Sequence, residues 1–271
     1  MDAKEKVYFL NIKERKISKE YLEKGFVIGP AANKEALSWI RKSFVDIAKK
    51  ELGINQKIGE ENFLDLIHQK IDISTLNDFR LSMLSKVNAL PGFRQKYYEI
   101  VKPYLDVIVG NELAMQLRVN LSIQLPNDDS SLLPIHADTW SGDSPFEVVA
   151  WVPLVNCYKT KSMYILPPNE NIELNNNFLS LAGENSETLY KSIEDKVNWV
   201  EVNFGSVMLF NQSLPHGNRI NMESETRWTM NCRFKGLFTP YKDKKIGEFF
   251  EPITLRAASI SGLNYEFPEL K

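Results

Sequence analysis

The sequence is short of cysteine, of excess charge and of long apolar runs, and each shortage excludes a class of protein. Two cysteines, Cys157 and Cys232, are too few for a disulfide framework and indicate a reduced, cytosolic protein. A net charge of -2 gives no electrostatic reason to expect nucleic acid as a partner. The longest apolar run, residues 148–155, is too short to span a membrane. Residues 1–6 carry no apolar signal region, so we expect a soluble, cytoplasmic protein.

What remains is the composition of an ordinary globular protein. At 271 residues, with 43% hydrophobic and 25% charged residues, the chain can bury a substantial core and is too balanced for disorder. We predict one domain over residues 1–271. It comprises a mainly helical support over 1–112, a strand-rich core over 113–240 with an insertion at about 167–196, and a C-terminal tail over 241–271.

Apolar residues at three- and four-residue spacing predict amphipathic helices in the first 112 residues. Leu37, Ile40 and Phe44 begin the clearest such stripe. The same pattern predicts helices over residues 30–52, 60–70, 74–87 and 91–109. Pro103 is expected to break or kink the last of them.

Near Glu112 the apolar period changes to two, which predicts strands. Over residues 117–125, leucine, valine and isoleucine alternate with Arg118, Asn120, Ser122 and Gln124. Further strands are predicted at residues 132–136, 146–153, 163–166, 199–203, 206–210 and 226–237. The polar stretch 167–196 is predicted to be a loop with a short helix around 187–195. The tail after residue 241 shows little periodicity.

Helices first and antiparallel strands afterwards predict an α+β fold, with helices packed on one face of a β-sandwich or barrel. In the 226–237 strand, Arg227, Thr229, Asn231 and Arg233 share one face, and the other face is apolar. Such a polar face either meets solvent or lines a barrel mouth that holds a polar ligand. The position of Arg227 after a histidine motif favours the second interpretation.

Two of the three histidines stand in a pattern typical of metal ligands. His136 and Asp138 are two residues apart, so both side chains point the same way from an extended strand. His216 follows 80 positions later in a turn-like segment between predicted strands. Two histidines and a carboxylate on one face of a metal leave open positions for substrate and oxygen, as in non-heme Fe(II) oxygenases. His68 has no partner in such a motif and is predicted to be structural.

Arg227 lies eleven residues after His216 and would be costly to bury without an anion. The carboxylate of a dicarboxylate co-substrate would supply one, and a surface cross-strand charge is the alternative. Arg233 points to the same face and is open to pairing with an acidic residue or with a charged substrate. Trp140 is open to covering the site from a loop, whereas Trp151 is expected in the core.

These motifs resemble those of Fe(II)/2-oxoglutarate-dependent dioxygenases of the phytanoyl-CoA dioxygenase superfamily. They are most similar to a subgroup associated with carbohydrate and aminoglycoside biosynthesis, chiefly at residues 136–154 and 214–234. The resemblance implies a double-stranded β-helix core, iron held by His136, Asp138 and His216, and 2-oxoglutarate held by Arg227. Halogenating relatives typically lack the carboxylate ligand, so Asp138 favours hydroxylation or another non-halogenating oxidation.

The resulting hypothesis is an oxygenase that uses Fe(II), 2-oxoglutarate and O2 on a small polar metabolite, such as a sugar, an amino sugar or a nucleotide-linked sugar. A metal-dependent isomerase and a non-catalytic ligand-binding barrel are alternatives on the same fold, and an acyl-CoA is the alternative substrate. The residues expected to contact the substrate lie on the polar strand faces and in the loop after the first ligands: Arg118, Asn120, Gln124, Trp140, Asn231 and Arg233.

Overall fold

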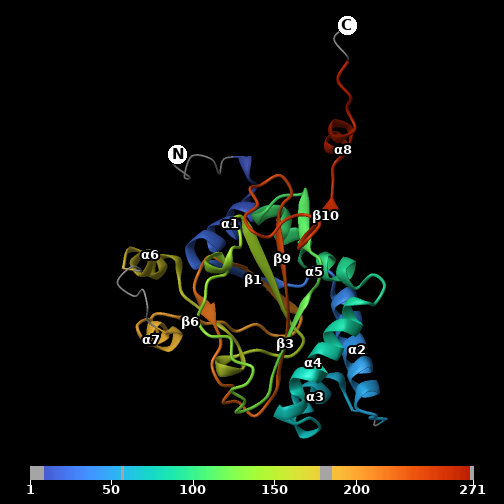
Figure 1. Cartoon of the computed structure of the whole chain (residues 1–271), viewed down its shortest axis with the longest axis vertical. Coiled ribbons are helices and arrows are strands. Elements are labelled where there is room, and N and C mark those ends of the chain that lie inside the picture. The colour runs from blue at the N-terminus through green and yellow to red at the C-terminus, as the bar shows by residue number, and fades with distance from the viewer. Residues whose placement is uncertain (1–8, 56–57, 178–184, 269–271) are drawn as a thin grey trace.

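A computed structural model of the chain describes residues 9–55, 58–177 and 185–268. Most helices precede the antiparallel strands, as predicted, but the N-terminal part also supplies one strand, β1 (Phe26–Pro30), and the strands form two sheets (Figure 1). The larger sheet is open, with β1 and β10 at its ends. Residues 1–6, part of the predicted insertion and the last three residues of the tail lie outside the described residues. No helix of the described residues is both long and apolar enough to cross a bilayer.

The helices of the N-terminal part form where apolar stripes and capping residues coincide. Asn33 precedes α2, and its side chain accepts a hydrogen bond from the backbone of Ala36 at 2.9 Å. The α-helices of the described residues are α1 (Ile12–Lys24), α2 (Lys34–Glu51), α3 (Glu60–Asp65), α4 (Ile73–Asn88), α5 (Phe93–Ile108), α6 (Pro168–Asn176), α7 (Ser186–Lys191) and α8 (Ala257–Leu263).

The four predicted N-terminal helices are present, but the one predicted over residues 60–70 ends at Asp65 and is followed by a 3-10 turn, η2 (Ile67–Gln69). Pro103 lies inside α5 and does not end it. Its side of the helix is exposed, so the carbonyl left without a donor can be hydrated. Helix α1 was not predicted because its apolar stripe is weak, and Ile17 is its one buried residue among those described.

The larger sheet has the order β1-β7-β4-β9-β2-β10, and β3 pairs with β9 beside β2. The smaller sheet has the order β6-β5-β8. The strands are β1 (Phe26–Pro30), β2 (Leu113–Gln116), β3 (Asn120–Gln124), β4 (Glu147–Pro153), β5 (Tyr164–Ile165), β6 (Asn198–Trp199), β7 (Ser206–Asn211), β8 (His216–Gly217), β9 (Arg227–Gly236) and β10 (Phe250–Thr254).

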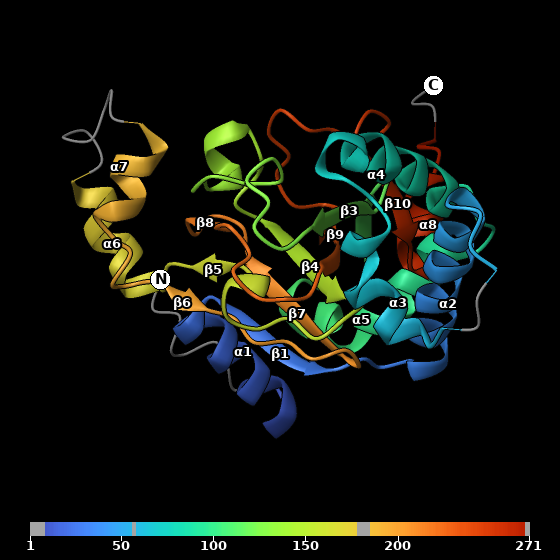
Figure 2. The ribbon, with the colours of Figure 1, turned by 90° about the horizontal axis from the view of Figure 1, so that it is seen from below.

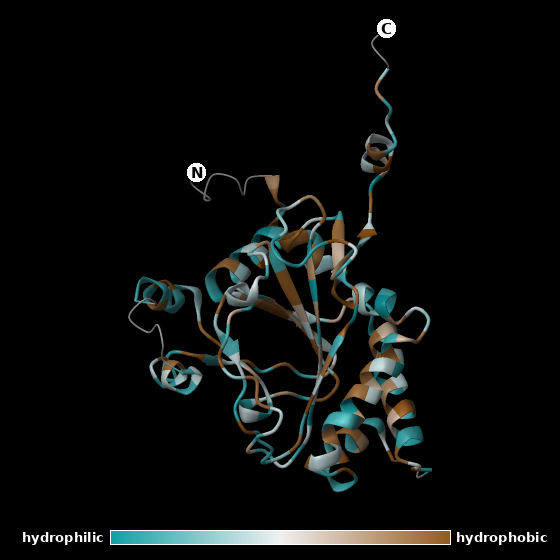
Figure 3. Cartoon of the chain, in the orientation of Figure 1, coloured by the Kyte–Doolittle hydropathy of each residue, from teal (hydrophilic) through white to brown (hydrophobic). Residues whose placement is uncertain are grey.

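One face of the larger sheet packs under the N-terminal helices. Trp228 of β9 is fully buried, meets Phe44 and Phe79 edge-on, and donates a hydrogen bond to the Leu64 carbonyl at 3.0 Å. Helices α2 to α5 lie on one flank of the sheets and α6 and α7 on the opposite flank (Figures 1 and 2). Hydrophobic residues run along the central strands and alternate with hydrophilic ones along the helices (Figure 3). The opposite, polar face of β9 therefore points away from the main core.

Of the strand predicted over residues 117–125, only β3 is a strand; β2 lies before this range, and both β2 and β3 pair with β9. From the pair Met115–Phe234 to the pair Asn120–Asn231, the segment that contains β2 and β3 advances by five residues, whereas β9 advances by three. The two extra residues bulge out of the ladder. Leu117 and Arg118 are consequently exposed, which corrects the expected alternation at these positions.

Three further predictions need correction. Residues 132–136 form no strand but an isolated bridge between His136 and His216, because Pro134 has no amide hydrogen for a ladder. The insertion contains α6 in addition to the predicted short helix, which is α7 and ends at Lys191. The tail, expected to lack periodicity, contributes the edge strand β10 and helix α8.

Candidate metal centre and anion pocket

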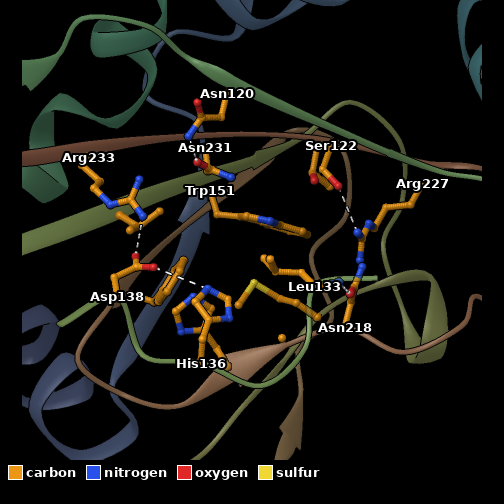
Figure 4. A pocket seen from close by; sticks show the side chains of 16 residues that line it. Asn120, Ser122, Leu133, His136, Asp138, Trp151, Asn218, Arg227, Asn231 and Arg233 are labelled. Carbon is orange, nitrogen blue, oxygen red and sulfur yellow. Dashed lines mark hydrogen bonds and ion pairs between the residues drawn. The ribbon is translucent and has the colours of Figure 1, made fainter. Parts of the chain in front are cut away.

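A cavity of about 250 Å³ lies between the two sheets. Its walls come from the polar face of β9, from β3 and β4, and from the segments around residues 136 and 216. The polar face of β9 therefore lines a cavity between the sheets, which agrees with the second interpretation of the sequence pattern. Figure 4 shows this pocket with its labelled side chains.

His136, Asp138 and His216 meet at one end of the pocket. One ligand atom from each lies within 4.8 Å of the others. The backbones of His136 and His216 exchange hydrogen bonds of 3.0 and 2.8 Å, which brings together residues that are 80 positions apart. Ala137 is extended, so His136 and Asp138 project to the same side, as predicted, and Asp138 begins a short 3-10 helix, η3 (Asp138–Ser141).

Both histidine rings are oriented by their own backbone. Nδ1 of His136 lies 2.8 Å from the Pro134 carbonyl, and Nδ1 of His216 lies 2.8 Å from the Leu214 carbonyl. A carbonyl only accepts, so each Nδ1 carries the proton and each Nε2 has a lone pair for a metal. Nε2 of His136 lies 3.4 Å from Asp138 Oδ1. The donor set of two neutral imidazoles and one carboxylate fits a divalent transition metal.

The electrostatics of this end favour the protonation states that bind metal. Burial, and after it the nearby His136, lowers the pKa of His216 to about 4. Burial alone would raise the pKa of Asp138, but the neighbouring His136 and the charge of Arg233 hold that pKa well below its usual range. At neutral pH His216 is neutral and Asp138 is ionised, as metal ligands must be.

Arg233 stands behind the Asp138 carboxylate and is paired with two acidic side chains. Its Nη2 lies 2.8 Å from Asp138 Oδ2, and its Nε lies 3.1 Å from Asp143 Oδ1 and 3.0 Å from Gln212 Oε1. Figure 4 shows the contact with Asp138. Of the alternatives left open by the sequence, the structure shows pairing with acidic residues.

Arg227 lies across the pocket from His136 and Asp138 (Figure 4). It is 4% exposed, and it donates hydrogen bonds to the Ser162 carbonyl at 2.7 Å and to Ser122 Oγ at 3.1 Å. Its Nε is buried without a hydrogen-bond partner, and it forms no ion pair with the described residues. Burial lowers its pKa to about 10, so it remains a cation at neutral pH. The surface-charge alternative is therefore wrong.

The wall between these two ends is partly polar. Asn120 and Asn231, which face each other across β3 and β9, are joined by a hydrogen bond of 2.9 Å and line the pocket. Thr229 lines it between Asn231 and Arg227. Trp151, expected in the core, is buried but borders the pocket, because β4 turns alternate residues toward it. Apolar side chains thus share this wall with hydrogen-bonding groups.

Not every predicted site residue reaches the pocket. Asn120, Asn231, Arg233 and Arg227 line it, whereas Arg118, Gln124 and Trp140 do not. Arg118 lies in the exposed bulge, and Trp140 on η3 is 41% exposed.

Gln124 turns to the chain itself instead, donating to the Arg219 carbonyl at 2.7 Å and contacting Asn218. His68, predicted to be structural, lies 3.0 Å from the Thr226 hydroxyl and outside the pocket lining.

Several lining residues were missed by sequence reasoning. Ser122 and Thr229 share the polar strand faces already identified, so alternation was the signal that could have found them. Leu133, Met163, Phe210 and Asn218 carried no such signal. Their position depends on how the small sheet folds over the large one, which no local pattern encodes.

No family model and no curated protein sequence matches the chain. Solved structures do. A nickel complex of ThoJ, a non-heme monooxygenase, superposes with a TM-score of 0.53 at 12% identity and covers 91% of each chain. HygX from Streptomyces hygroscopicus, with nickel and 2-oxoglutarate bound, gives 0.51 at 15% identity over 86% of this chain and 89% of its own.

A third match is an epimerase. SnoN, in complex with Fe3+, alpha ketoglutarate and nogalamycin RO, gives a TM-score of 0.50 at 12% identity over 89% of this chain and 96% of its own. At these identities the likeness establishes a shared fold. The resemblance inferred from sequence motifs is thereby confirmed at the level of fold, and the fold is one that both oxygenases and an epimerase use.

Proposed function

We propose that the chain is an Fe(II)- and 2-oxoglutarate-dependent oxygenase that acts on a small polar metabolite. The observation that carries this proposal is one pocket with a two-histidine, one-carboxylate cluster at one end and, at the other, a buried arginine that has no acidic partner among the described residues. A 2-oxo dicarboxylate has a chelating end for a metal and a carboxylate for a guanidinium, so it matches both ends. HygX, which shares the fold, holds 2-oxoglutarate and nickel.

In this proposal each residue has a defined task. His136, Asp138 and His216 would hold Fe(II). Arg227 would bind the distal carboxylate of 2-oxoglutarate, with Ser122 and the Ser162 carbonyl fixing the direction of its guanidinium. When bound, the iron and 2-oxoglutarate supply oxidising chemistry from O2, with succinate and carbon dioxide as by-products.

We infer further that the two sheets are the two halves of a double-stranded β-helix. The smaller sheet covers the pocket-lining face of the larger one, and the pocket lies between them, as a ligand site in such a core would. On this basis residues 1–271 form a single dioxygenase domain, with the helices of 1–112 supporting the outer face of the larger sheet.

The pocket supports a small polar substrate, with carbohydrates the proposed class. Asn120, Asn231 and Thr229 offer hydrogen-bonding groups beside the metal ligands. A cavity of about 250 Å³ is below the usual range for ligand sites, so it admits a compact reacting group together with the co-substrate. An acyl-CoA would need a long apolar groove, whereas in this pocket the apolar lining residues are interspersed with polar ones.

A second candidate is epimerisation, because the neighbour SnoN is an epimerase that binds iron and alpha ketoglutarate. The residues that bind the metal and 2-oxoglutarate would be the same. The two reactions differ in the product: oxygenation adds an oxygen atom to the substrate, and epimerisation leaves its mass unchanged.

The test is succinate release by the iron-loaded protein. We expect slow release with 2-oxoglutarate alone and faster release with one member of a panel of free sugars, amino sugars, nucleotide sugars and acyl-CoAs. His216→Ala should abolish release, and His68→Ala, which alters a histidine outside the pocket, should retain it. Product mass then separates oxygenase from epimerase. Stimulation by acyl-CoA alone would overturn the carbohydrate proposal, and no iron-dependent succinate would overturn the oxygenase itself.

A further inference from the structure

Behind the carboxylate ligand, four side chains alternate in charge. Asp138 contacts Arg233, Arg233 contacts Asp143, and Asp143 accepts hydrogen bonds from Lys244 Nζ at 2.6 and 2.8 Å. Asp143 is 1% exposed and the Arg233 side chain 15% exposed. Each charge has a neighbour of opposite sign, so the row is neutral as a whole. That balance is what lets it stay buried.

Lys244, the fourth of these side chains, comes from the connection between β9 and β10. This connection lies outside both sequence motifs, residues 136–154 and 214–234. Residues 240–244, here called the clamp segment, run along the loop that carries Asp138. The Asp243 amide donates to the Gly142 carbonyl at 3.2 Å, and Ser144 Oγ donates to the Pro240 carbonyl at 2.7 Å.

The contact between clamp segment and loop is close. Gly142 has a φ of 89°, and a Cβ at that position would lie 2.2 Å from Asp243 Oδ2. The positive φ is what favours glycine at this position. The Asp243–Gly142 and Ser144–Pro240 hydrogen bonds hold the clamp segment beside the loop, so Lys244 is held against Asp143 by backbone as well as by charge.

We propose that Arg233 is a positioning residue for the metal-binding carboxylate and that Lys244 of the clamp segment completes it. The inference rests on the proposed metal site at His136, Asp138 and His216. Arg233 Nη2 holds Asp138 Oδ2, which turns Oδ1 toward the histidines. Asp143 fixes the other side of the guanidinium, and Lys244 balances the charge of Asp143. Outer contacts of this kind orient metal ligands and tune metal affinity.

A merely structural ion-pair row would not need the fork geometry of arginine. Arg233 uses Nη2 for Asp138 while Nε serves Asp143 and Gln212, so two carboxylates are held at fixed positions by one planar group. A lysine keeps the charge but offers one nitrogen in place of the fork. Arg233→Lys therefore separates position from charge.

The experiment is Co(II) titration of the purified full chain without 2-oxoglutarate, followed by visible absorption, which reports both affinity and coordination geometry. We expect Arg233→Lys to weaken Co(II) about 10- to 100-fold and to alter the spectrum. Lys244→Met should weaken it about 10-fold, the low end of that range. Lys244→Arg should restore affinity and spectrum, since arginine can pair with Asp143 again.

Lys245→Met is the matched control, because Lys245 is the exposed neighbour of Lys244 in sequence, and it should match the wild type. Wild-type affinity and spectrum in both Arg233→Lys and Lys244→Met would overturn this inference while leaving the proposed function intact. So would a loss in Lys244→Met that Lys244→Arg does not restore, or an Arg233→Lys defect confined to 2-oxoglutarate binding. A wild-type chain that binds no Co(II) would overturn the metal site and the proposed function with it.

Discussion

Arg227 and Arg233 stand on the same face of the same strand, six residues apart, and both line the pocket, yet their surroundings differ in kind. Arg233 is balanced by Asp138 and Asp143, whereas Arg227 has a carbonyl and a hydroxyl as its partners and forms no ion pair with the described residues. The same side chain is thus part of the protein's own charge balance at one end and available to an external anion at the other. The neighbours determine the role.

The comparison also separates what each end contributes. The metal end is a network in which any single change leaves another charge unbalanced. The Arg227 end is one cation whose hydrogen-bond partners are neutral, so its charge is balanced when an anion arrives. Stability should therefore depend on the first end and co-substrate affinity on the second.

The largest expected effect is on the free energy of unfolding, when each arginine is replaced by the uncharged methionine and the two losses are compared. Arg233→Met leaves Asp138 and Asp143 buried beside a thioether, which should lower the free energy of unfolding of the metal-free protein by about 3–5 kcal/mol. Arg227→Met removes two hydrogen bonds of about 0.5–1.5 kcal/mol each, together with a buried charge that has no acidic partner among the described residues, so its net cost should stay below about 3 kcal/mol. Urea denaturation of both variants measures the difference. Equal losses would mean that the two arginines are not distinguished by their partners.

The next effect concerns pH, because the metal end titrates in the acid range and Arg227 does not. The pKa of His216 is lowered by burial to about 4 from an ordinary value of 6.5. Between these values the unfolded chain binds a proton that the folded chain does not, so this share of stability is complete above pH 6.5 and is lost toward pH 4.

Glu147 acts in the opposite sense. Its carboxylate accepts a hydrogen bond of 3.0 Å from Gln212, the amide that also contacts Arg233. Burial raises its pKa to about 7 from 4.5, so the folded chain keeps a proton that the unfolded chain has released, and stability falls as pH rises through this window.

In the wild type, His216 and Glu147 change the free energy of unfolding with pH in opposite directions. Replacing either residue should therefore reveal the pH dependence that the other contributes. His216→Asn should give a stability that falls with rising pH, and Glu147→Gln one that rises, with the His216 contribution amounting to about 3 kcal/mol across the window. Urea denaturation of metal-free protein at pH 4.5, 5.5 and 6.5 measures both. Profiles parallel to the wild type in both variants would refute the assigned pKa directions.

A smaller effect tests the Arg227 end directly. Arg227→Lys keeps the charge but loses the fork, and it should weaken 2-oxoglutarate by about 1.5–3 kcal/mol, roughly 10- to 150-fold. Calorimetric titration of 2-oxoglutarate at saturating metal provides the measurement. Metal affinity should be unchanged, in contrast to Arg233→Lys. If 2-oxoglutarate binds Arg227→Lys as tightly as the wild type, the anion site lies elsewhere.

The smallest expected effect concerns Asn231, which lies between the candidate metal-binding residues and Arg227 along the pocket wall. Asn231→Leu removes the hydrogen bond with Asn120 and should lower stability by about 0.5–1.5 kcal/mol. It should reduce substrate-stimulated succinate release, because a site built to hydrogen-bond its substrate loses a partner. Release with 2-oxoglutarate alone should persist, which makes it the internal control. Loss of both activities would place Asn231 in the metal or co-substrate site instead.

Local pattern predicted much of this molecule. The stripe from Leu37 to Phe44 predicted α2, and the alternation from Arg227 to Phe234 predicted β9 together with its pocket face. The candidate metal-binding cluster could be predicted because the sequence has few histidines and because a two-residue spacing places His136 and Asp138 on one side. These features are encoded within a few neighbouring residues.

What escaped prediction depends on distant partners. Arg118 was expected in the pocket because alternation was read through a bulge that is visible only against β9. Gln124 has the right parity, but its amide binds the Arg219 carbonyl, 95 residues away. The pairing of Asp143 with Lys244 spans 101 residues and has no sequence motif. Charge at a position does not reveal which opposite charge the fold brings to it.

The bridge between His136 and His216 also bears on when the site comes into existence. The bridge closes a loop of 80 residues, and closing a long loop costs chain entropy before the contacts between its ends can repay it. We therefore expect His136 and His216 to come together late in folding. A nascent or partly folded chain would present the two histidines far apart and capture metal poorly. Metal that binds only the finished fold adds to its stability by mass action. A metal bound at the proposed site would then raise the fraction of folded chain in addition to serving the proposed reaction.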